Sequence, residues 1–286
     1  MSYIFLIVLA MTSHLARGGG STAIDFKQLL RMERAKASQK PLSSRSKELM
    51  KRRSPVDFGS FELEGGKGSI WLIPEYVSED EAKLLEDEAQ GGGEADWTNL
   101  YKRRLQVLGG YPHPDGMVPE AIPPYMAALT ESLVQSGVFP EEKRPNHILL
   151  NEYRMGQGIA PHKDGPLYSP LVAILSLGSA VSLGFWSSFE AASEGKEPEI
   201  SVPMPHRSLV IFSDKAYLDF WHGIIATEGD ESEYRLSYTV RNVPRILPED
   251  QVMETETFRQ ELKRRKHLFQ FSVTEKLPPK PAEAES

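Results

Sequence analysis

The stretch Pro161-His162-Lys163-Asp164 places a histidine and a carboxylate two residues apart. If this segment is a β-strand, the side chains of His162 and Asp164 project from the same face and can bind one ion together. Farther along the chain, His222 offers a third ligand. Two histidines and one carboxylate form the facial set that suits non-haem Fe(II), and this set leaves coordination positions open for a co-substrate and dioxygen. We therefore predict a metal site at these three residues.

A second stretch, Arg235-Leu236-Ser237-Tyr238-Thr239-Val240-Arg241, alternates polar and apolar side chains. In a strand, Arg235 and Arg241 would lie on one face together with Ser237 and Thr239. Two guanidinium groups inside a barrel would cost several kcal/mol unless an anion satisfies them, and one dicarboxylate ligand could serve both. The alternation leaves another arrangement open, in which one or both arginines face solvent or pair with Asp or Glu.

The chain after Pro145 consists of short apolar segments separated by turns, a pattern that predicts β-strands. The expected strands are residues 147–153, 171–177, 181–186, 208–212, 221–225 and 234–243. We expect a mainly β fold, a sandwich or barrel, in which strands distant in sequence face one another across a cavity. Residues 190–203 are polar and acidic, so we expect a loop there.

Flanking helices are predicted before this region. Residues 70–73 are expected to form a strand, and Ser78 with Glu81 forms a capping box that starts a helix ending near Ala89. A second helix is expected from Pro124 to Gly137, because Pro is accepted in the first helical turn. Residues 109–124 are rich in turn-forming residues and are expected to be a loop.

The amino-acid composition excludes several kinds of functional site. The chain has no cysteine, which excludes disulfides, thiolate zinc sites, iron–sulfur clusters and a cysteine nucleophile. The formal charge of −7 gives no global argument for nucleic-acid binding. One basic cluster, between Arg31 and Arg53, holds nine Lys or Arg against two Glu. It fits a nuclear-import or nucleic-acid-contact segment, or a solvated arm.

The two ends of the chain differ from its middle. The apolar run from Tyr3 to Met11 is too short to span a bilayer, which needs roughly 20 residues, and no basic residue precedes it as in a signal peptide. We expect no membrane association and a nuclear or cytoplasmic protein. The expected organisation is a leader and basic arm at 1–68, a main domain at 69–247 and an appendage at 248–286 with one helix near 254–267.

Several further polar residues are candidates. Asn151 and Tyr153 alternate on one face of the strand that leads to His162, and both can donate to carboxylate oxygens. Residues 97–108 form either a lid that meets a nucleic acid or a packed β element with a charged edge. In the first case the contacts come from Tyr101, Lys102, Arg103 and Arg104. We interpret the remaining histidines as loop or structural residues: His113, His147 and His206.

Together these motifs resemble the AlkB family of Fe(II)- and 2-oxoglutarate-dependent dioxygenases. The resemblance rests on Asn151-x-Tyr153, His162-x-Asp164, His222 and the pair Arg235 and Arg241. It covers about residues 70 to 247 and excludes both ends. Further matching stretches are Arg103-Arg104-Leu105-Gln106, Gly116-Met117-Val118-Pro119, Gly165-Pro166-Leu167-Tyr168, Leu175-Ser176-Leu177-Gly178-Ser179 and Pro205-His206-Arg207-Ser208-Leu209.

The resemblance implies a double-stranded β-helix, or jelly roll, with Fe(II) held by His162, Asp164 and His222. It implies that Arg235 and Tyr153 hold the distal carboxylate of 2-oxoglutarate, with Arg241 and Asn151 near the end that chelates the metal. The implied reaction uses dioxygen to demethylate an N-alkylated base of RNA or DNA, with release of succinate, CO2 and formaldehyde. Residues 97–113 would be the nucleotide-recognition lid.

One position departs from the family pattern. Base-repair members carry an acidic residue two positions after the iron-binding Asp, and here that position is Pro166. Two alternatives therefore stay open. One is a 2-oxoglutarate oxygenase that acts on a protein side chain or a small molecule, and the other is a binding module that retains the barrel without turnover.

Overall fold

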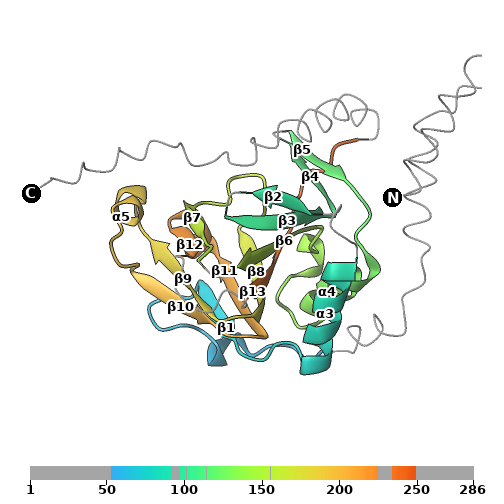
Figure 1. Ribbon diagram of the computed structural model, residues 1–286, viewed down its shortest axis with the longest axis horizontal. Helices are drawn as coiled ribbons and strands as arrows, with labels where there is room; N and C mark the ends of the chain where they lie inside the picture. Colours follow the sequence, from blue (N-terminus) through green and yellow to red (C-terminus); the bar gives the residue numbers. More distant parts are fainter. Residues whose placement is uncertain are drawn as a thin grey trace, which may run out of the picture. The chain divides into compact units, whose positions relative to one another are not determined.

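Two antiparallel sheets form the body of the protein in a computed structural model that describes residues 53–91, 97–100, 102–113, 115–154, 156–224 and 234–248 (Figure 1). The larger sheet has the order β1 (Ile70–Ile73), β11 (Ser208–Ser213), β8 (Leu171–Gly178), β13 (Tyr234–Arg241), β6 (His147–Arg154), β3 (Arg103–Leu108) and β2 (Thr98–Leu100). The smaller has the order β10 (Ile200–Met204), β9 (Val181–Trp186), β12 (Trp221–Ile224) and β7 (Ile159–His162).

The path of the chain between the sheets is that of a jelly roll. From β6 onward, β6, β8, β11 and β13 lie in the larger sheet, and β7, β9, β10 and β12 lie in the smaller one. The last strand, β13, pairs on one side with β6 and on the other with β8. Strands far apart in sequence are thus neighbours, and the expected double-stranded β-helix is confirmed.

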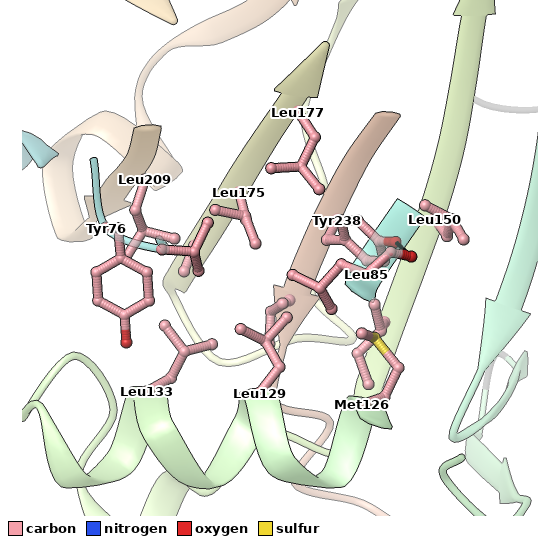
Figure 2. Packing of buried hydrophobic residues seen from close by; sticks show 14 of the residues in the cluster. Tyr76, Leu85, Met126, Leu129, Leu133, Leu150, Leu175, Leu177, Leu209 and Tyr238 are labelled. Carbon is pink, nitrogen blue, oxygen red and sulfur yellow. Dashed lines mark hydrogen bonds between the residues drawn. The ribbon is translucent and has the colours of Figure 1, made fainter. Parts of the chain in front are cut away.

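The outer face of the larger sheet packs on two helices, α3 (Glu79–Gly91) and α4 (Pro124–Gln135). Figure 2 shows Met126, Leu129 and Leu133 of α4 directed toward the sheet, with Leu129 and Leu133 on the side of Leu175 and Met126 on the side of Leu150. Each buried leucine contributes about 1.5–3 kcal/mol relative to an exposed one. This helix-covered core fixes the outer face, so the opposite face of the sheet is left to line the space between the two sheets.

The space between the sheets is apolar at one end and polar at the other. Val172, Ile174, Val210 and Phe212 of β8 and β11 pack there against Phe185 of β9. Beside them in the larger sheet lie β13 and β6, whose inward residues are mostly polar. The alternation predicted for β13 is confirmed, because Leu236, Tyr238 and Val240 belong to the helix-covered core while the residues between them are buried on the other face.

Both helices have the local signals expected of them. The backbone N–H of Ser78 donates to Glu81 Oε2 at 2.8 Å, and the N–H of Glu81 donates to Ser78 Oγ at 3.2 Å, which is the reciprocal capping box. Helix α4 begins at Pro124 and ends at Gln135, just before Gly137. None of the described helices is long and apolar enough to cross a membrane.

The structure corrects two expectations about loops. Residues 109–124 contain a hairpin of β4 (Gly110–His113) and β5 (Gly116–Pro119). Residues 190–203 contain most of α5 (Phe189–Ser193) and of β10. The proline in β10, Pro203, obscured the strand in the sequence, but β10 is an edge strand, where proline is tolerated. Helix α6 (Asp214–Leu218) was not predicted, and the strand considered for residues 161–164 is β7, which ends at His162.

Packing also begins upstream of the expected boundary at residue 69. Val56, Phe58 and Phe61 pack against the helix-covered core, and the backbone N–H of Val56 donates to the carbonyl of Ser136 at 2.9 Å. A 3-10 turn, η1 (Phe58–Ser60), lies in this segment, and another, η3 (Glu141–Lys143), follows α4. The leader, most of the basic arm and the helix expected near 254–267 lie outside the described residues.

Candidate functional site

His162 and His222 face each other across a strand pair. They are Cα partners in the antiparallel pairing of β7 with β12, and their ring centroids are 4.4 Å apart. Strand β7 ends at His162, so Asp164 reaches the same place from the turn that follows and not from the strand itself. One ligand atom from each of the three residues lies within 4.8 Å of the other two, close enough to hold one metal ion.

Local hydrogen bonding prepares His162 as a ligand. Its Nδ1 lies 3.0 Å from the carbonyl oxygen of Ala160, so this nitrogen must carry the proton. The other nitrogen, Nε2, then presents a lone pair and lies 4.0 Å from Asp164 Oδ1. In metal-binding histidines the ring nitrogen that does not bind the metal commonly makes a hydrogen bond of this kind, which fixes the tautomer.

Electrostatics keep the three groups in their metal-binding protonation states. Burial, followed by the charge of His162, lowers the pKa of His222 to about 3, so its imidazole is neutral. Burial alone would raise the pKa of Asp164, but Arg241 and the nearby histidines outweigh it and the pKa is lowered. A neutral imidazole and an ionised carboxylate are the forms that bind metal.

Arg235 and Arg241 are both buried on the inner face of β13, with 2% and 7% of their surface exposed. This excludes the alternative in which they face solvent. Arg235 Nε donates to Ser176 Oγ at 2.8 Å, and burial lowers the pKa of Arg235 to about 10, so the guanidinium stays charged at neutral pH. Arg241 pairs with a carboxylate, as the other alternative allowed, but that carboxylate is Asp164, at 2.6 Å.

Asn151 and Tyr153 lie on the same inner surface. In the pairing of β6 with β13, Asn151 is opposite Ser237 and Tyr153 is opposite Arg235, whose guanidinium lies 5.5 Å from the Tyr153 ring centroid. Burial raises the pKa of Tyr153, so its hydroxyl keeps its proton and remains a possible donor. The structure therefore brings together the four residues expected around a dicarboxylate.

The basic residues predicted for substrate contact divide between two faces of β3. Arg103 points inward, where its Nε donates to Asn151 Oδ1 at 3.0 Å. Arg104 points to the opposite face, where it pairs with Glu152 at 2.7 Å and lies over the Trp97 ring at 4.4 Å. Arg104 therefore projects away from the face that Arg103 shares with Asn151, because neighbouring strand residues project to opposite faces.

The other two residues predicted to contact the substrate are Lys102 and Tyr101. Lys102 is exposed in the turn between β2 and β3. Tyr101 lies outside the described residues.

Three inward residues were missed in the sequence or given another role. Ser176 accepts from Arg235, and the Tyr168 ring lies 4.7 Å below the Arg241 guanidinium. His147 was interpreted as a loop or structural residue, but it is 1% exposed, is the Cα partner of Arg241 and packs 5.3 Å from Tyr168. Its spacing of four residues from Asn151 places it on the same face and could have revealed it.

Unsatisfied polar atoms concentrate in this space. Among the described residues, the buried side-chain atoms without a hydrogen-bond partner include Asp164 Oδ2, His222 Nδ1, Arg235 Nη1, Arg241 Nε and both ring nitrogens of His147. Buried polar groups in native proteins are nearly always paired. The two arginines could be satisfied by an acidic ligand, and the two-histidine, one-carboxylate set beside them could hold a metal. The site therefore fits a divalent metal together with a dicarboxylate co-substrate.

A jelly roll that encloses such a set defines a class of metal-dependent oxygenases. The family model described as the 2OG-Fe(II) oxygenase superfamily matches residues 72–243. The chain belongs to this superfamily, whose members use Fe(II), 2-oxoglutarate and dioxygen, and it is a dioxygenase.

Individual relatives point the same way. A Danio rerio protein named as a probable RNA/DNA demethylase, ALKBH6, is 32% identical over 218 residues, which is 67% of this chain and 93% of that protein. An uncharacterised protein of Acanthamoeba polyphaga mimivirus, L905, is 31% identical over 60% of this chain and 83% of its own length. A solved structure of OsALKBH1 aligns with 61% of this chain and 96% of its own, with 15% identity and a TM-score of 0.46.

Proposed function

We propose that this dioxygenase removes N-alkyl groups from bases of RNA or DNA, with His162, Asp164 and His222 as its metal ligands. The observation that carries the proposal is the inward position of Arg103, which places a cation beside Asn151, close to the metal-ligand set. The charge of Arg103 also acts on the pKa of both His162 and Tyr153. The name of the Danio rerio relative, a probable RNA/DNA demethylase, supports the same class of substrate.

In the proposed mechanism the protein's side chains bind and orient the reactants. Arg235 and Tyr153 would hold one carboxylate of 2-oxoglutarate, and Arg241 and Asn151 would lie near its other end. When bound, Fe(II) supplies the oxidation that hydroxylates an N-methyl group, after which the product loses formaldehyde. Because Arg103 occupies the oxygen of the Asn151 amide, the NH2 group of Asn151 is left free to donate to the co-substrate.

The remaining guanidinium nitrogens of Arg103 are the proposed contact with a phosphate or base. Arg103 is half-buried and only its Nε has a hydrogen bond to another described residue. A planar, permanently charged fork suits phosphate oxygens and can also stack on a base. Exposed Lys102 would add a second positive charge on the approach to the site, and Tyr101 stays a proposed contact.

The test is turnover on single-stranded RNA and DNA oligonucleotides that carry N-methylated bases, with Fe(II), 2-oxoglutarate and ascorbate. We expect formaldehyde and the unmodified base, and neither product with Asp164→Ala. Arg103→Met should raise KM for the oligonucleotide about tenfold. It should lower 2-oxoglutarate turnover without substrate by a smaller factor, because there it removes only the hydrogen bond that orients the Asn151 amide. Succinate formation with no reversion of any methylated base would reject the proposal.

A second substrate class has one specific observation in its favour. Pro166 stands where base-repair relatives carry an acid, so the usual contact to the base is missing. An oxygenase that acts on a protein side chain or a small molecule would not need that contact. Hydroxylated or demethylated protein in treated extracts, without any change in RNA or DNA, would favour this alternative.

We also propose that residues 69–247 form the catalytic domain, with the packed segment from Arg53 as part of it. Burial of Leu247, which packs with Val118, supports the downstream limit. Residues 248–286 would be an appendage, and a nuclear or cytoplasmic location remains a prediction.

A further inference from the structure

The candidate ligand Asp164 is not held in place by the sheet. His162 and His222 are fixed opposite each other by the pairing of β7 with β12, but Asp164 follows the last residue of β7. The next residue, Gly165, has a φ of +90°, a left-handed conformation that turns the chain away from the strand direction. Something other than strand pairing must therefore set the position of the Asp164 backbone.

Two hydrogen bonds bracket Asp164 and connect its turn to α6. On one side, Lys163 Nζ donates to the carbonyl of Leu218 at 2.6 Å. On the other side, Tyr217 Oη donates to the carbonyl of Gly165, also at 2.6 Å. The two bonds run in opposite directions between the same pair of segments, so together they resist both sliding and rotation of the turn.

Helix α6 is a firm support for these bonds. Ala216 and Tyr217 are buried in the core between the sheets, and the Tyr217 ring is stacked on Phe212 of β11, with 6.4 Å between ring centroids. The chain continues from Leu218 directly into β12, which carries His222. Lys163 also lies 5.8 Å from the ring centroid of Trp221, the neighbour of His222. Helix α6 is therefore connected both to the turn that carries Asp164 and to strand β12, which carries His222.

We propose that Lys163 and Tyr217 are positioning residues that hold the Asp164 turn against α6 and thereby set the geometry of the metal site. The inference rests on the proposed metal-binding role of Asp164. It assigns a function to the residue between the two ligands, whose side chain points away from the metal. Partners that orient metal ligands typically change metal affinity about 10- to 100-fold when they are removed.

The test is titration of the metal-free full-length protein with Co(II), followed by its visible d–d absorption. Lys163→Met keeps the aliphatic stem over Trp221 and removes the donor, and Tyr217→Phe keeps the buried ring and removes the hydroxyl. We expect each change to weaken Co(II) binding about tenfold and to alter the shape of the d–d spectrum. Lys163→Arg, which retains a donor, should restore binding to within about threefold of wild type.

A matched control lies on the same helix. Lys215 is exposed and pairs with Asp219 at 2.9 Å, so Lys215→Met removes a lysine from α6 without touching the turn. It should leave Co(II) affinity and spectrum unchanged. If wild type binds Co(II) and Lys163→Met and Tyr217→Phe bind it equally well, the positioning role is overturned while the metal site stands. If wild type itself binds no Co(II), the proposed metal site fails instead.

Discussion

Arg241 donates to Asp164 across 2.6 Å in the interior, although Asp164 is also one of the three groups placed to hold a metal. The arginine occupies Oδ1, while Oδ2 has no partner among the described residues. The ion pair thus keeps the carboxylate charged and leaves one oxygen for the metal. Arg241 has two tasks in this arrangement, because it also lies at the end of the site where we place the chelating part of the co-substrate.

Arg241→Met should therefore destabilise the metal-free protein by about 3–5 kcal/mol, because it leaves an unpaired charge in the interior. Addition of Mn(II) should recover part of this loss, since the metal replaces the missing positive charge. Urea denaturation with and without Mn(II) measures both effects. Arg144→Met is the control, because Arg144 pairs with Glu131 and Glu141 at the surface and should cost no more than about 1 kcal/mol. Equal stability of the two variants would contradict this view of Arg241.

The two neighbouring arginines of β3 should behave differently. Arg104→Met should cost about 3 kcal/mol in urea denaturation, because the Glu152 carboxylate, 2% exposed, would lose its main partner. Arg103→Met removes only one hydrogen bond at a half-buried position and should cost about 1 kcal/mol or less. The double change Arg104→Met with Glu152→Leu should be more stable than Arg104→Met alone. A larger loss with Arg103→Met than with Arg104→Met would contradict the assignment of faces.

Arg235→Met should affect stability and ligand binding in opposite directions. Burial lowers the pKa of Arg235 from 12.5 to about 10, a shift that corresponds to roughly 3 kcal/mol of cost for the charged form. Removing the charge should raise the free energy of unfolding of the ligand-free protein. The same change should weaken 2-oxoglutarate binding at least about 100-fold in calorimetry with Mn(II), since a charged hydrogen-bonding partner is lost. Unchanged 2-oxoglutarate affinity would remove Arg235 from the site.

The burial of His147 predicts how the stability of the protein depends on pH. Burial, followed by the charge of Arg241, lowers the pKa of His147 from 6.5 to about 3, so between these values the unfolded chain binds a proton that the folded protein does not. Titration of His147 therefore lowers the free energy of unfolding as the pH falls below about 6.5, by up to about 1.4 kcal/mol per pH unit.

His147→Phe tests this directly. The variant should be more stable than wild type at neutral pH, because a buried imidazole without a hydrogen-bond partner among the described residues costs about 1–3 kcal/mol. Its advantage should grow between pH 7 and pH 5, as measured by urea denaturation at each pH. A constant difference across this range would show that His147 does not titrate in this way.

The parts of the site that follow a strict period were predictable from the sequence. The alternation of residues 235–241 determined which side chains of β13 point inward, since the strand period is two wherever the chain lies. The chelating trio was predicted from residue type, because two histidines and one carboxylate form a set that suits iron. The strand period did not place it, since β7 ends at His162 and Asp164 lies in the turn that follows.

Contacts between segments distant in sequence were harder to predict from the sequence. Arg103 and Arg104 are adjacent on one strand, so the strand period places them on opposite faces, but the sequence does not show which face is the inner one. Their partners on β6 do, since Arg103 contacts Asn151 and Arg104 contacts Glu152. The support of the Asp164 turn by Tyr217 joins residues 52 positions apart through a helix too short to leave a periodic signal. Strand β10 was hidden for a related reason, because its proline is acceptable only at a sheet edge, and edges are a property of the whole fold.

We expect the space between the sheets to bind iron and 2-oxoglutarate through His162, Asp164, His222 and the two buried arginines of β13. The most direct measurement is succinate formation from 2-oxoglutarate under air with Fe(II), for wild type, His222→Ala and the surface control Arg144→Met. We expect succinate from wild type and Arg144→Met and none above background from His222→Ala. Undiminished succinate formation by His222→Ala would contradict this expectation.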